Sequence, residues 1–321
     1  MAVYASVFRE ARPGVTLVGA GAVGRVLALR LRAQAYPIRA ILSRTRAHAD
    51  ALARKVEAAS ASDDLRDLPP ATRLLLICVP DDDLPRVADD LARVRHDWRG
   101  TVVAHVSGAL PAAVLDPLAD LGADVLSFHP LQTITPQSDP ATLDDIYVGL
   151  EGDAKPVAAG IELAVGLGMR YLVLSAEAKA RYHLAASMAS NFFVTLMGLV
   201  QEILLSLDID RADSFAVIEP LVRGTLANLA ASTPEDVLTG PVARGDLDTL
   251  RRHGLALRQH LPHLIPVYSA LTVETTRLAV RSGSLDPEDA EDVLGLMQRL
   301  VNVPRSATTP ASSPRRTGTD G

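Results

Sequence analysis

A short apolar run that leads directly into three spaced glycines constrains the fold of this chain more than any other feature. Residues 14–28 read GVTLVGAGAVGRVLA, where a strand-forming segment precedes the spacing Gly-x-Gly-x-x-Gly and a helical pattern follows. In that motif the glycines permit a tight turn, close approach of the backbone to a pyrophosphate, and packing of helix on strand. The helix N-terminus then holds the phosphates. The residues predicted to bind a dinucleotide here are Gly19, Ala20, Gly21, Ala22, Val23 and Gly24. The alternative is a tight turn that binds no ligand.

The end of the next expected strand indicates which dinucleotide is bound. An acidic residue about 20 residues beyond the glycines would normally accept the ribose hydroxyls of NAD. This chain has Ser43 there, followed by Arg44 and Arg46. A hydroxyl and a guanidinium bind a 2′-phosphate through charge-assisted hydrogen bonds, whereas a carboxylate would repel it. The segment therefore predicts NADP(H) as the cofactor. Alternatively, both arginines belong to a solvated loop before the next helix.

Length and composition are typical of a soluble enzyme with two domains. The chain has 321 residues, 48% of them apolar and 22% charged, and its net charge of −6 comes from interspersed acidic and basic residues. This distribution excludes the basic footprint of a nucleic-acid-binding protein. The single cysteine, Cys78, lies in an apolar run and is expected to be buried. With no intrachain disulfide available, a cytoplasmic location is predicted.

Three segments bear on targeting, on membrane insertion and on disorder at the end of the chain. Residues 1–12 have no long apolar core and do not resemble a secretion signal. Residues 192–207 are apolar but interrupted by polar side chains, so a buried helix is expected there and no membrane partner. From Pro304 onward the composition changes to Ser, Thr, Pro, Arg and Gly, which predicts a disordered tail over residues 304–321.

Strand-like and helical runs alternate through the first half of the chain. This order predicts an α/β fold, a Rossmann-type doubly wound parallel sheet over residues 1–175. Beyond residue 175 the strands stop, and the long amphipathic stretches over residues 176–303 predict an all-α C-terminal domain. In doubly wound sheets ligands bind beyond the carboxyl ends of the strands, so the loops there are candidate sites.

Three such loops carry candidate residues. Val79 and Pro80 follow a buried strand and are expected to border the nucleotide. Ser107, beside a glycine, offers a hydroxyl to a substrate, and His129, held by a proline, could orient or protonate one. The alternatives are that Ser107 caps the helix expected to start near Pro111, and that His129 makes structural hydrogen bonds at a strand end.

The helix expected from residue 176 carries a polar stripe among apolar residues. Its members project within about 120° of one another at helical spacing; they are Lys179, His183, Ser187, Ser190 and Asn191. Unsatisfied polar groups in a core are costly, so the stripe must find partners or face a cleft. Because imidazole titrates near neutrality, His183 is the best acid or base candidate, with Asn191 beside it. Alternatively, Lys179 and His183 are simply the exposed face at the start of the helix.

A loop over residues 238–246 contains Thr, Gly, Pro, Arg and Asp and precedes another helix. It is equally consistent with a connector capped by Asp246 and with a loop that closes on a substrate or a second subunit. The remaining histidines show no metal-ligand spacing, and no metal is predicted.

Together these motifs resemble the bacterial Rossmann-like proteins that carry a DUF2520 helical domain, distant relatives of pyrroline-5-carboxylate reductase and of the 3-hydroxyacid and 6-phosphogluconate dehydrogenases. The resemblance rests on the glycine motif and on His105–Gly108, Phe128–Gln132, Tyr182–His183, Ser190–Asn191 and Thr239–Asp246. It implies an NADP-type cofactor and homodimers formed through the helical domain. The better-known relatives often have a catalytic Lys-x-x-x-Asn on the first helix after the sheet. Here Lys179 is followed four residues later by His183, and Asn191 lies two turns further on.

The sequence therefore predicts an NADP-dependent oxidoreductase that transfers hydride between nicotinamide and a small polar carbonyl, hydroxyl or imine compound. His183 would move the proton, and Ser107, His129 and Asn191 would position the substrate. The alternatives are a sensor or regulatory protein that binds NADP(H) without catalysis, and a deazaflavin-dependent reductase on the same fold.

Overall fold

The structure, a computed structural model, describes residues 12–302. The predicted tail at residues 304–321 and residues 1–11 of the segment weighed as a secretion signal lie outside the described residues. The chain divides into two compact units, residues 1–193 and residues 194–321. The predicted boundary at residue 175 marks the end of the sheet, but the helix that follows has its contacts with the sheet and belongs to the first unit.

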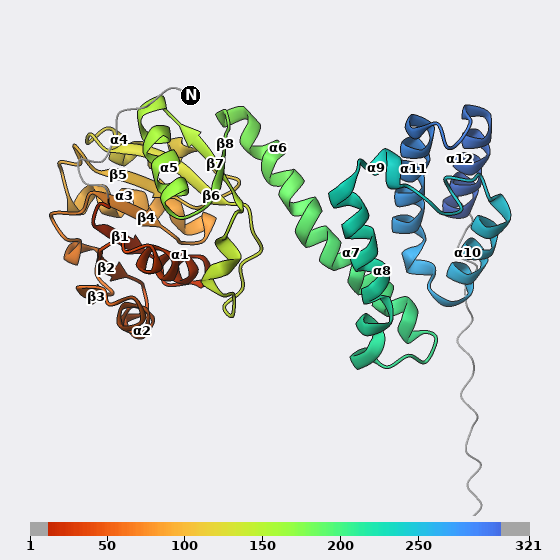
Figure 1. The fold of residues 1–321 in the computed structure, drawn as a ribbon, viewed down its shortest axis with the longest axis horizontal. Helices are drawn as coiled ribbons and strands as arrows, with labels where there is room; N and C mark the ends of the chain where they lie inside the picture. The colour runs from red at the N-terminus through yellow and green to blue at the C-terminus, as the bar shows by residue number, and fades with distance from the viewer. Residues whose placement is uncertain (1–11, 303–321) are drawn as a thin grey trace, which may run out of the picture. The chain divides into compact units, whose positions relative to one another are not determined.

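The first unit is built on an eight-stranded sheet with the order β3-β2-β1-β4-β5-β6-β7-β8 (Figure 1). Its strands are β1 (Val15–Val18), β2 (Ile38–Leu42), β3 (Ser60–Ser62), β4 (Leu74–Ile77), β5 (Val102–His105), β6 (Asp124–Pro130), β7 (Tyr147–Gly152) and β8 (Arg170–Val173). The helices between them are α1 (Ala22–Ala33), α2 (Arg46–Val56), α3 (Leu84–Val94), α4 (Asp116–Ala119) and α5 (Ala154–Gly166). The doubly wound fold predicted from the alternation of elements is confirmed.

One pairing in the sheet departs from the all-parallel prediction. Strand β7 runs antiparallel to β6, and β8 then pairs parallel with β7. Two parallel neighbours need a crossover, usually a helix, and the segment between β6 and β7 holds only the short 3-10 turn η4 (Pro140–Leu143). The chain therefore turns back at this edge. Strand β3 was missed because Ser60–Ser62 is short and carries no apolar run.

Alternate side chains of the central strands pack on opposite faces of the sheet. In β4, Leu74 and Leu76 belong to one buried apolar cluster, whereas Leu75 and Ile77 belong to the other. Both faces are covered by helices, which explains why the strand is apolar throughout. Cys78 is buried beyond the end of β4, and this burial raises the pKa of its thiol to about 12, so it is an inert core residue.

The strand order places a topological switch point at β1. Connections from β1 lead to β2 on one side of it, whereas β4 lies on the other side. The turns that follow β1 and β4 therefore diverge at the carboxyl edge of the sheet, which leaves a crevice there in folds of this class.

The C-terminal part is all helical, as predicted. A continuous helix comprises α6 (Ala176–Ser187), a π-helical turn (Met188–Phe192) and α7 (Phe193–Leu205). The second unit continues with α8 (Arg211–Ala231), α9 (Pro234–Val237), α10 (Leu247–His260), α11 (Ile265–Ser282) and α12 (Pro287–Asn302). Helices α10 and α11 are separated at Pro262, which lacks the amide needed to continue a helix.

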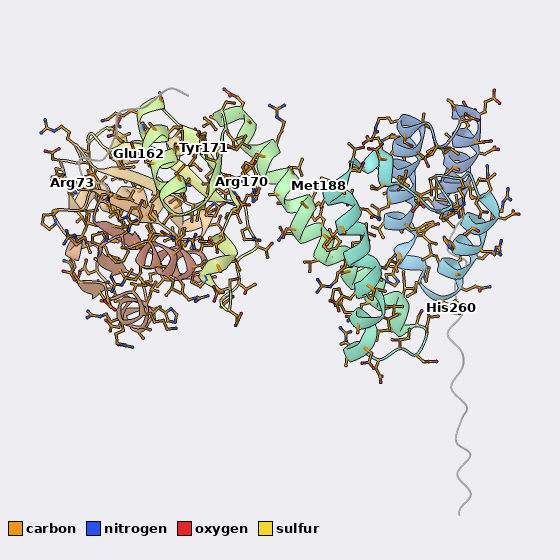
Figure 2. All side chains as sticks on the ribbon, in the orientation of Figure 1. Arg73, Glu162, Arg170, Tyr171, Met188 and His260 are labelled. Atoms are coloured by element: carbon orange, nitrogen blue, oxygen red, sulfur yellow. The ribbon has the colours of Figure 1, made fainter. Side chains whose placement is uncertain are left out.

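The prediction of a buried helix over residues 192–207 is wrong for the single chain. No residue of α7 is buried; Val194 is 67% exposed, and Met188 in the π-helical turn before it is 58% exposed (Figure 2). Among the described residues, one helix, Ala176–Leu205, is long and apolar enough to cross a bilayer by length and composition alone. The same length and composition suit a helix face that is covered by protein.

Candidate functional site

The turn between β1 and α1 is held by close contacts that only glycine allows. Gly19 has a φ of +106°, and a Cβ there would lie 2.2 Å from the carbonyl oxygen of Cys78. A Cβ on Gly24 would lie 2.1 Å from the carbonyl oxygen of Gly19. These two glycines therefore bring the turn and the helix directly against the end of β4.

The N-terminus of α1 is suited to an anion. Gly21 precedes the helix without any side-chain cap, and the first turn contains no acidic residue. A Cβ on Gly21 would meet no atom within 4 Å, in contrast to Gly19 and Gly24. The first turn, which begins with Ala22 and Val23, thus offers uncapped amide donors beside an open space. A pyrophosphate requires this arrangement, so the residues present fit a dinucleotide.

A cavity of about 900 Å³ lies beside this turn. The predicted cofactor residues that line it are Gly19, Ala20, Gly21, Ser43, Arg44, Val79 and Pro80. Ala22, Val23 and Gly24 are not in the lining, because they form the first turn of the helix and its contact with the strand. His48, to which the sequence assigned no role, also lines the cavity.

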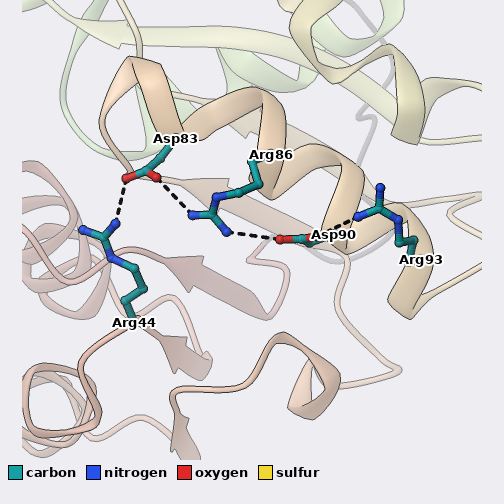
Figure 3. A network of polar contacts seen from close by, with 5 residues as sticks. All are labelled: Arg44, Asp83, Arg86, Asp90 and Arg93. Carbon is teal, nitrogen blue, oxygen red and sulfur yellow. Dashed lines mark hydrogen bonds and ion pairs between the residues drawn. The ribbon is translucent and has the colours of Figure 1, made fainter.

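The two arginines after β2 have different partners. Arg44 lines the cavity, and its Nη1 lies 3.1 Å from Oδ2 of Asp83, which ends the short turn before α3 (Figure 3). Arg46 is the first residue of α2, where its Nε lies 3.0 Å from Oδ1 of Asp50 in the same helix, and it is not in the cavity lining. Of the two arginines, Arg44 therefore lies where a 2′-phosphate is expected, whereas Arg46 is solvated, as in the alternative, but belongs to α2 and not to the loop before it.

A second cavity, of about 650 Å³, is lined by the end of β6, the loop after it and the polar stripe that starts on α6. Its lining combines three neighbouring rings with amides and hydroxyls; the polar members are His129, Gln132, Thr133, Tyr182, His183, Ser187, Ser190 and Asn191. Of the four residues predicted to act in catalysis, this cavity brings together His129, His183 and Asn191. Ser107 lines neither cavity.

Strand register explains how His129 meets Tyr182. His129 of β6 is paired with Gly149 of β7, and the Tyr182 ring lies over this glycine, where a Cβ would be 2.8 Å from its hydroxyl. The Tyr182 hydroxyl is 3.0 Å from Nδ1 of His129. Burial raises the pKa of Tyr182 to about 12, so the phenol keeps its proton. Burial, aided by the charges of Lys179 and His183, lowers the pKa of His129 to about 4. In the tautomer whose Nδ1 accepts from the phenol, a neutral His129 carries its N–H at Nε2.

The loop after β5 approaches both histidines through a glycine. A Cβ on Gly108 would lie 2.7 Å from Cδ2 of His183 and 2.8 Å from Nε2 of His129. The two imidazoles meet edge to face, with ring centroids 6.2 Å apart and an interplanar angle of 77°. Because Gly108 has no side chain, the imidazoles of His129 and His183 can lie next to each other.

Lys179 lies beneath this group as a buried cation. Its side chain is 1% exposed, and its Nζ donates to the carbonyl oxygen of Ser107, at 3.1 Å, and to Oγ of Ser127. Burial lowers the pKa of Lys179 to about 8, although the negative charges of Glu151 and Asp81 oppose the shift. The alternative in which Lys179 belongs to an exposed helix face is thus wrong. This lysine joins α6 to the loop after β5 and to β6.

Ser107 has a structural hydroxyl. The residue is buried, and its Oγ accepts from the amides of Ala109 and Leu110 at 3.2 and 3.0 Å. Its own amide donates to Nδ1 of the buried His105, at 3.1 Å. These contacts resemble the predicted alternative of a local cap, although the hydroxyl closes the loop itself and not the turn after Pro111.

The polar stripe is completed by the π-helical turn. Ser190 and Asn191 lie in this turn and face the second cavity with His183 and Ser187. The hydroxyl of Ser190 is 2.7 Å from that of Thr133 in the loop after β6. Single π-helical turns inside α-helices are frequent at functional sites.

The loop over residues 238–246 is a capped connector in the second unit. Asp246 is the N-cap of α10 and accepts from the amide and the hydroxyl of Thr249, at 3.0 and 2.7 Å. Gly240 and Gly245 have positive φ angles of +107° and +65°. Within residues 12–302, no group of three or more His, Cys, Asp or Glu side chains is placed to hold a metal ion.

Sequence reasoning missed three contributors to these sites. Glu151 is buried in β7 and accepts from the amide of Ala112 at 2.6 Å. The sequence signal for this role was a carboxylate within an otherwise apolar strand. Tyr182 was noted for the family resemblance but given no role. Asp83 belongs to an acidic run after β4. Its partner, Arg44, is 39 residues away in the sequence, so no local pattern links the two.

Two family models match successive parts of the chain, and the second match begins before β7, within the sheet. Residues 2–130 match the family described as a Rossmann-like domain, and residues 146–275 match DUF2520, a domain of unknown function. The chain is thus a Rossmann-like protein with a DUF2520 domain, as its motifs predicted. No curated protein matches the sequence.

Solved structures share this fold. A Bacteroides fragilis protein provisionally assigned as an NADP oxidoreductase has a TM-score of 0.70 and 24% identity, over 83% of this chain and 99% of its own. A Thermotoga maritima protein whose name states no function has a TM-score of 0.66 and 26% identity, over 83% and 98%. An imine reductase from Myxococcus stipitatus in complex with NADP+ has a TM-score of 0.54 and 17% identity, over 90% and 94%. The chain therefore shares its fold with NADP-dependent oxidoreductases.

Two glycines of the motif should respond differently to alanine. Gly19→Ala should destabilise the fold by about 2 kcal/mol or more, since it adds a Cβ at a positive φ against the Cys78 carbonyl. Gly21→Ala should change the free energy of unfolding by less than about 1 kcal/mol, because its Cβ meets open space. Urea unfolding measures both. Equal destabilisation would contradict the assignment of Gly21 to a ligand.

The buried histidines should make the fold acid-sensitive. The pKa of His105 is lowered to about 3 and that of His129 to about 4, both chiefly by burial, from an ordinary value of 6.5. The unfolded chain therefore binds more protons below about pH 6.5, and stability falls as the pH decreases. Each histidine should lower the free energy of unfolding by about 2 kcal/mol at pH 5 relative to pH 7. Urea unfolding of His129→Asn should show a shallower pH dependence than that of the exposed control His96→Asn; identical slopes would contradict the role of His129.

Proposed function

We propose that this protein is an NADP(H)-dependent oxidoreductase that acts on a small polar carbonyl, hydroxyl or imine compound. One observation carries the proposal. The glycine turn, with its uncapped helix, and the His129–Tyr182–His183 group both lie at the carboxyl edge of the parallel strands. Ligands of doubly wound sheets bind at this edge. A site for an anionic dinucleotide and a site with titratable rings thus belong to one unit of the chain.

The first cavity would hold the cofactor. The amides at the start of α1 and the open space at Gly21 suit the pyrophosphate, and Ser43 with Arg44 suits the 2′-phosphate. Val79 and Pro80 would border the nucleotide where β4 ends. A bound nicotinamide supplies or accepts the hydride in this chemistry.

The second cavity would hold the substrate and move the proton. Hydride addition to a carbonyl carbon leaves a negative oxygen, and the imidazole of His183 would donate the proton to it; in the reverse direction it would accept that proton. The neutral His129, with its N–H at Nε2, would orient the same oxygen, and Asn191 would add polar contacts. Ser107 would act indirectly, through the loop that carries Gly108.

The lining of the second cavity favours an uncharged polar substrate. Among its described residues are histidine, tyrosine, amide and hydroxyl side chains, but no Lys, Arg, Asp or Glu. Lys179 of α6 is not in this lining, because its ammonium group is held by the main chain of Ser107 and the hydroxyl of Ser127. Such a lining can form hydrogen bonds with a substrate, but it has no charged side chain to pair with a carboxylate or ammonium group of that substrate.

A sensor that binds NADP(H) without catalysis is the second candidate. The burial of Lys179 favours it, because the lysine that several relatives use in catalysis is here bonded to Ser107 and Ser127 and does not line the cavity.

We also propose that the chain is a cytoplasmic homodimer formed through its helical part. The exposed apolar side chains of α7 and α8 support a second copy as the cover; the most exposed are Val194, Phe215, Val217, Leu221 and Leu226. Exposed apolar surface of this kind marks protein contacts in soluble proteins. The single, buried cysteine is consistent with a reducing compartment.

The proposed reaction is tested by separating binding from turnover. NADPH should bind the wild-type protein and His183→Ala with the same Kd in a fluorescence titration, because His183 lies outside the dinucleotide cavity. Against a panel of ketones, imines and alcohols, the variant should lose about 100-fold or more in kcat. The exposed His96→Ala serves as the matched control. Wild-type binding without any turnover would establish the sensor instead, and absence of binding would refute both.

The proposed dimer is tested with a charge on the exposed helix. Leu221→Glu, at a side chain that is 73% exposed on α8, should give a monomer in light scattering, because a buried unpaired carboxylate is costly at an interface. Val165→Glu, 61% exposed on α5 of the other unit, should leave the dimer intact. A monomeric wild-type protein would refute the proposal.

A further inference from the structure

A chain of alternating charges runs from the loop after β2 along α3. Arg44 contacts Asp83, Asp83 contacts Arg86, Arg86 contacts Asp90, and Asp90 contacts Arg93 (Figure 3). The contact distances in this order are 3.1, 3.0, 3.2 and 2.8 Å. All of these residues line the dinucleotide cavity. These five charged side chains of the cavity wall are therefore already paired with one another in the protein alone, whereas Asp63 and Asp64 of the same wall lie outside the chain of contacts.

Asp83 is the branching carboxylate of this chain. Its Oδ2 accepts from Arg44 and its Oδ1 accepts from Arg86. The side chain of Asp83 is 25% exposed, whereas that of Arg44 is 77% exposed. Arg44 can thus leave Asp83 for another anion at little cost, while Arg86 continues to neutralise the carboxylate.

We propose that Asp83 sets the preference between NADP and NAD by competing with the 2′-phosphate for Arg44. The proposal rests on the dinucleotide function argued above. The phosphate and the Asp83 carboxylate are both anions that a single guanidinium at Arg44 can bind. Binding of NADP exchanges one partner of Arg44 for the other and leaves a carboxylate near the phosphate, which opposes it. NAD has no 2′-phosphate, so its binding needs no such exchange.

The sign of the effect follows from this exchange. Neutralising Asp83 removes both the competitor and the opposing charge, so NADP should bind more tightly. The charge of Arg44 stays available, because within residues 12–302 Arg44 has no acidic partner other than Asp83. NAD, which does not use Arg44 through a phosphate, should bind as before. Asp83 is in this sense a residue that determines specificity and does not take part in chemistry.

Isothermal titration calorimetry with NADP+ and NAD+ tests the proposal without any substrate. For Asp83→Asn the Kd for NADP+ should fall by about two- to fivefold, the range that corresponds to an exposed ion pair. The Kd for NAD+ should stay unchanged. Asp50→Asn is the matched control, because Asp50 also pairs with an arginine after β2, at 3.0 Å, but that arginine does not line the cavity. This control should leave both Kd values unchanged.

A second variant shows whether Arg44 carries the effect. Arg44→Gln should weaken NADP+ binding, and adding Asp83→Asn to it should give a smaller gain than in the wild-type background. An equal gain in both backgrounds would overturn the proposal, as would a gain shared by NAD+ or a Kd for NADP+ that does not fall. In each of these cases wild-type binding of NADP+ would leave the proposed function standing. If the wild-type protein bound neither nucleotide, both proposals would fail.

Discussion

The close approach of the first crossover turn to strand β4 is the constraint on which the rest of the structure depends. Gly19 lies against the Cys78 carbonyl, and Gly24 lies against the Gly19 carbonyl, so no side chain fits between turn, helix and strand. This packing carries the N-terminus of α1 to the switch point of the sheet. The larger cavity, Arg44 beyond β2 and the turn before α3 are arranged around that point.

Buried charge organises the neighbouring loops. Lys179 brings an ammonium group into the core, which costs free energy that two hydrogen bonds and the nearby Glu151 partly offset. The contacts tie α6 to the loop after β5 and to β6. Its positive charge also helps to keep His129 neutral. Lys179 does not line the second cavity, but its charge thereby affects the protonation of His129, which does.

Local patterns predicted the fold well because the decisive forces act over a few residues. The apolar run of β4, the glycine turn and the polar stripe of α6 each follow from the spacing of side chains along one element. The same reasoning missed the antiparallel β7, since a connection without a helix carries no periodic signal. It also missed the exposure of α7. An apolar helix has the same sequence pattern whether its own chain or another surface covers it.

By itself, the sequence determined a Rossmann-type unit followed by helices, a tight glycine turn at Gly19–Gly24, and a cluster of titratable residues on the first long helix. Only the tertiary structure decided that Lys179 is sequestered, that Tyr182 reaches His129 over Gly149, and that Arg44 is paired with Asp83. The physical reason is the same in each case. Burial and ion pairing are set by neighbours from distant segments, and strand register and loop paths choose those neighbours.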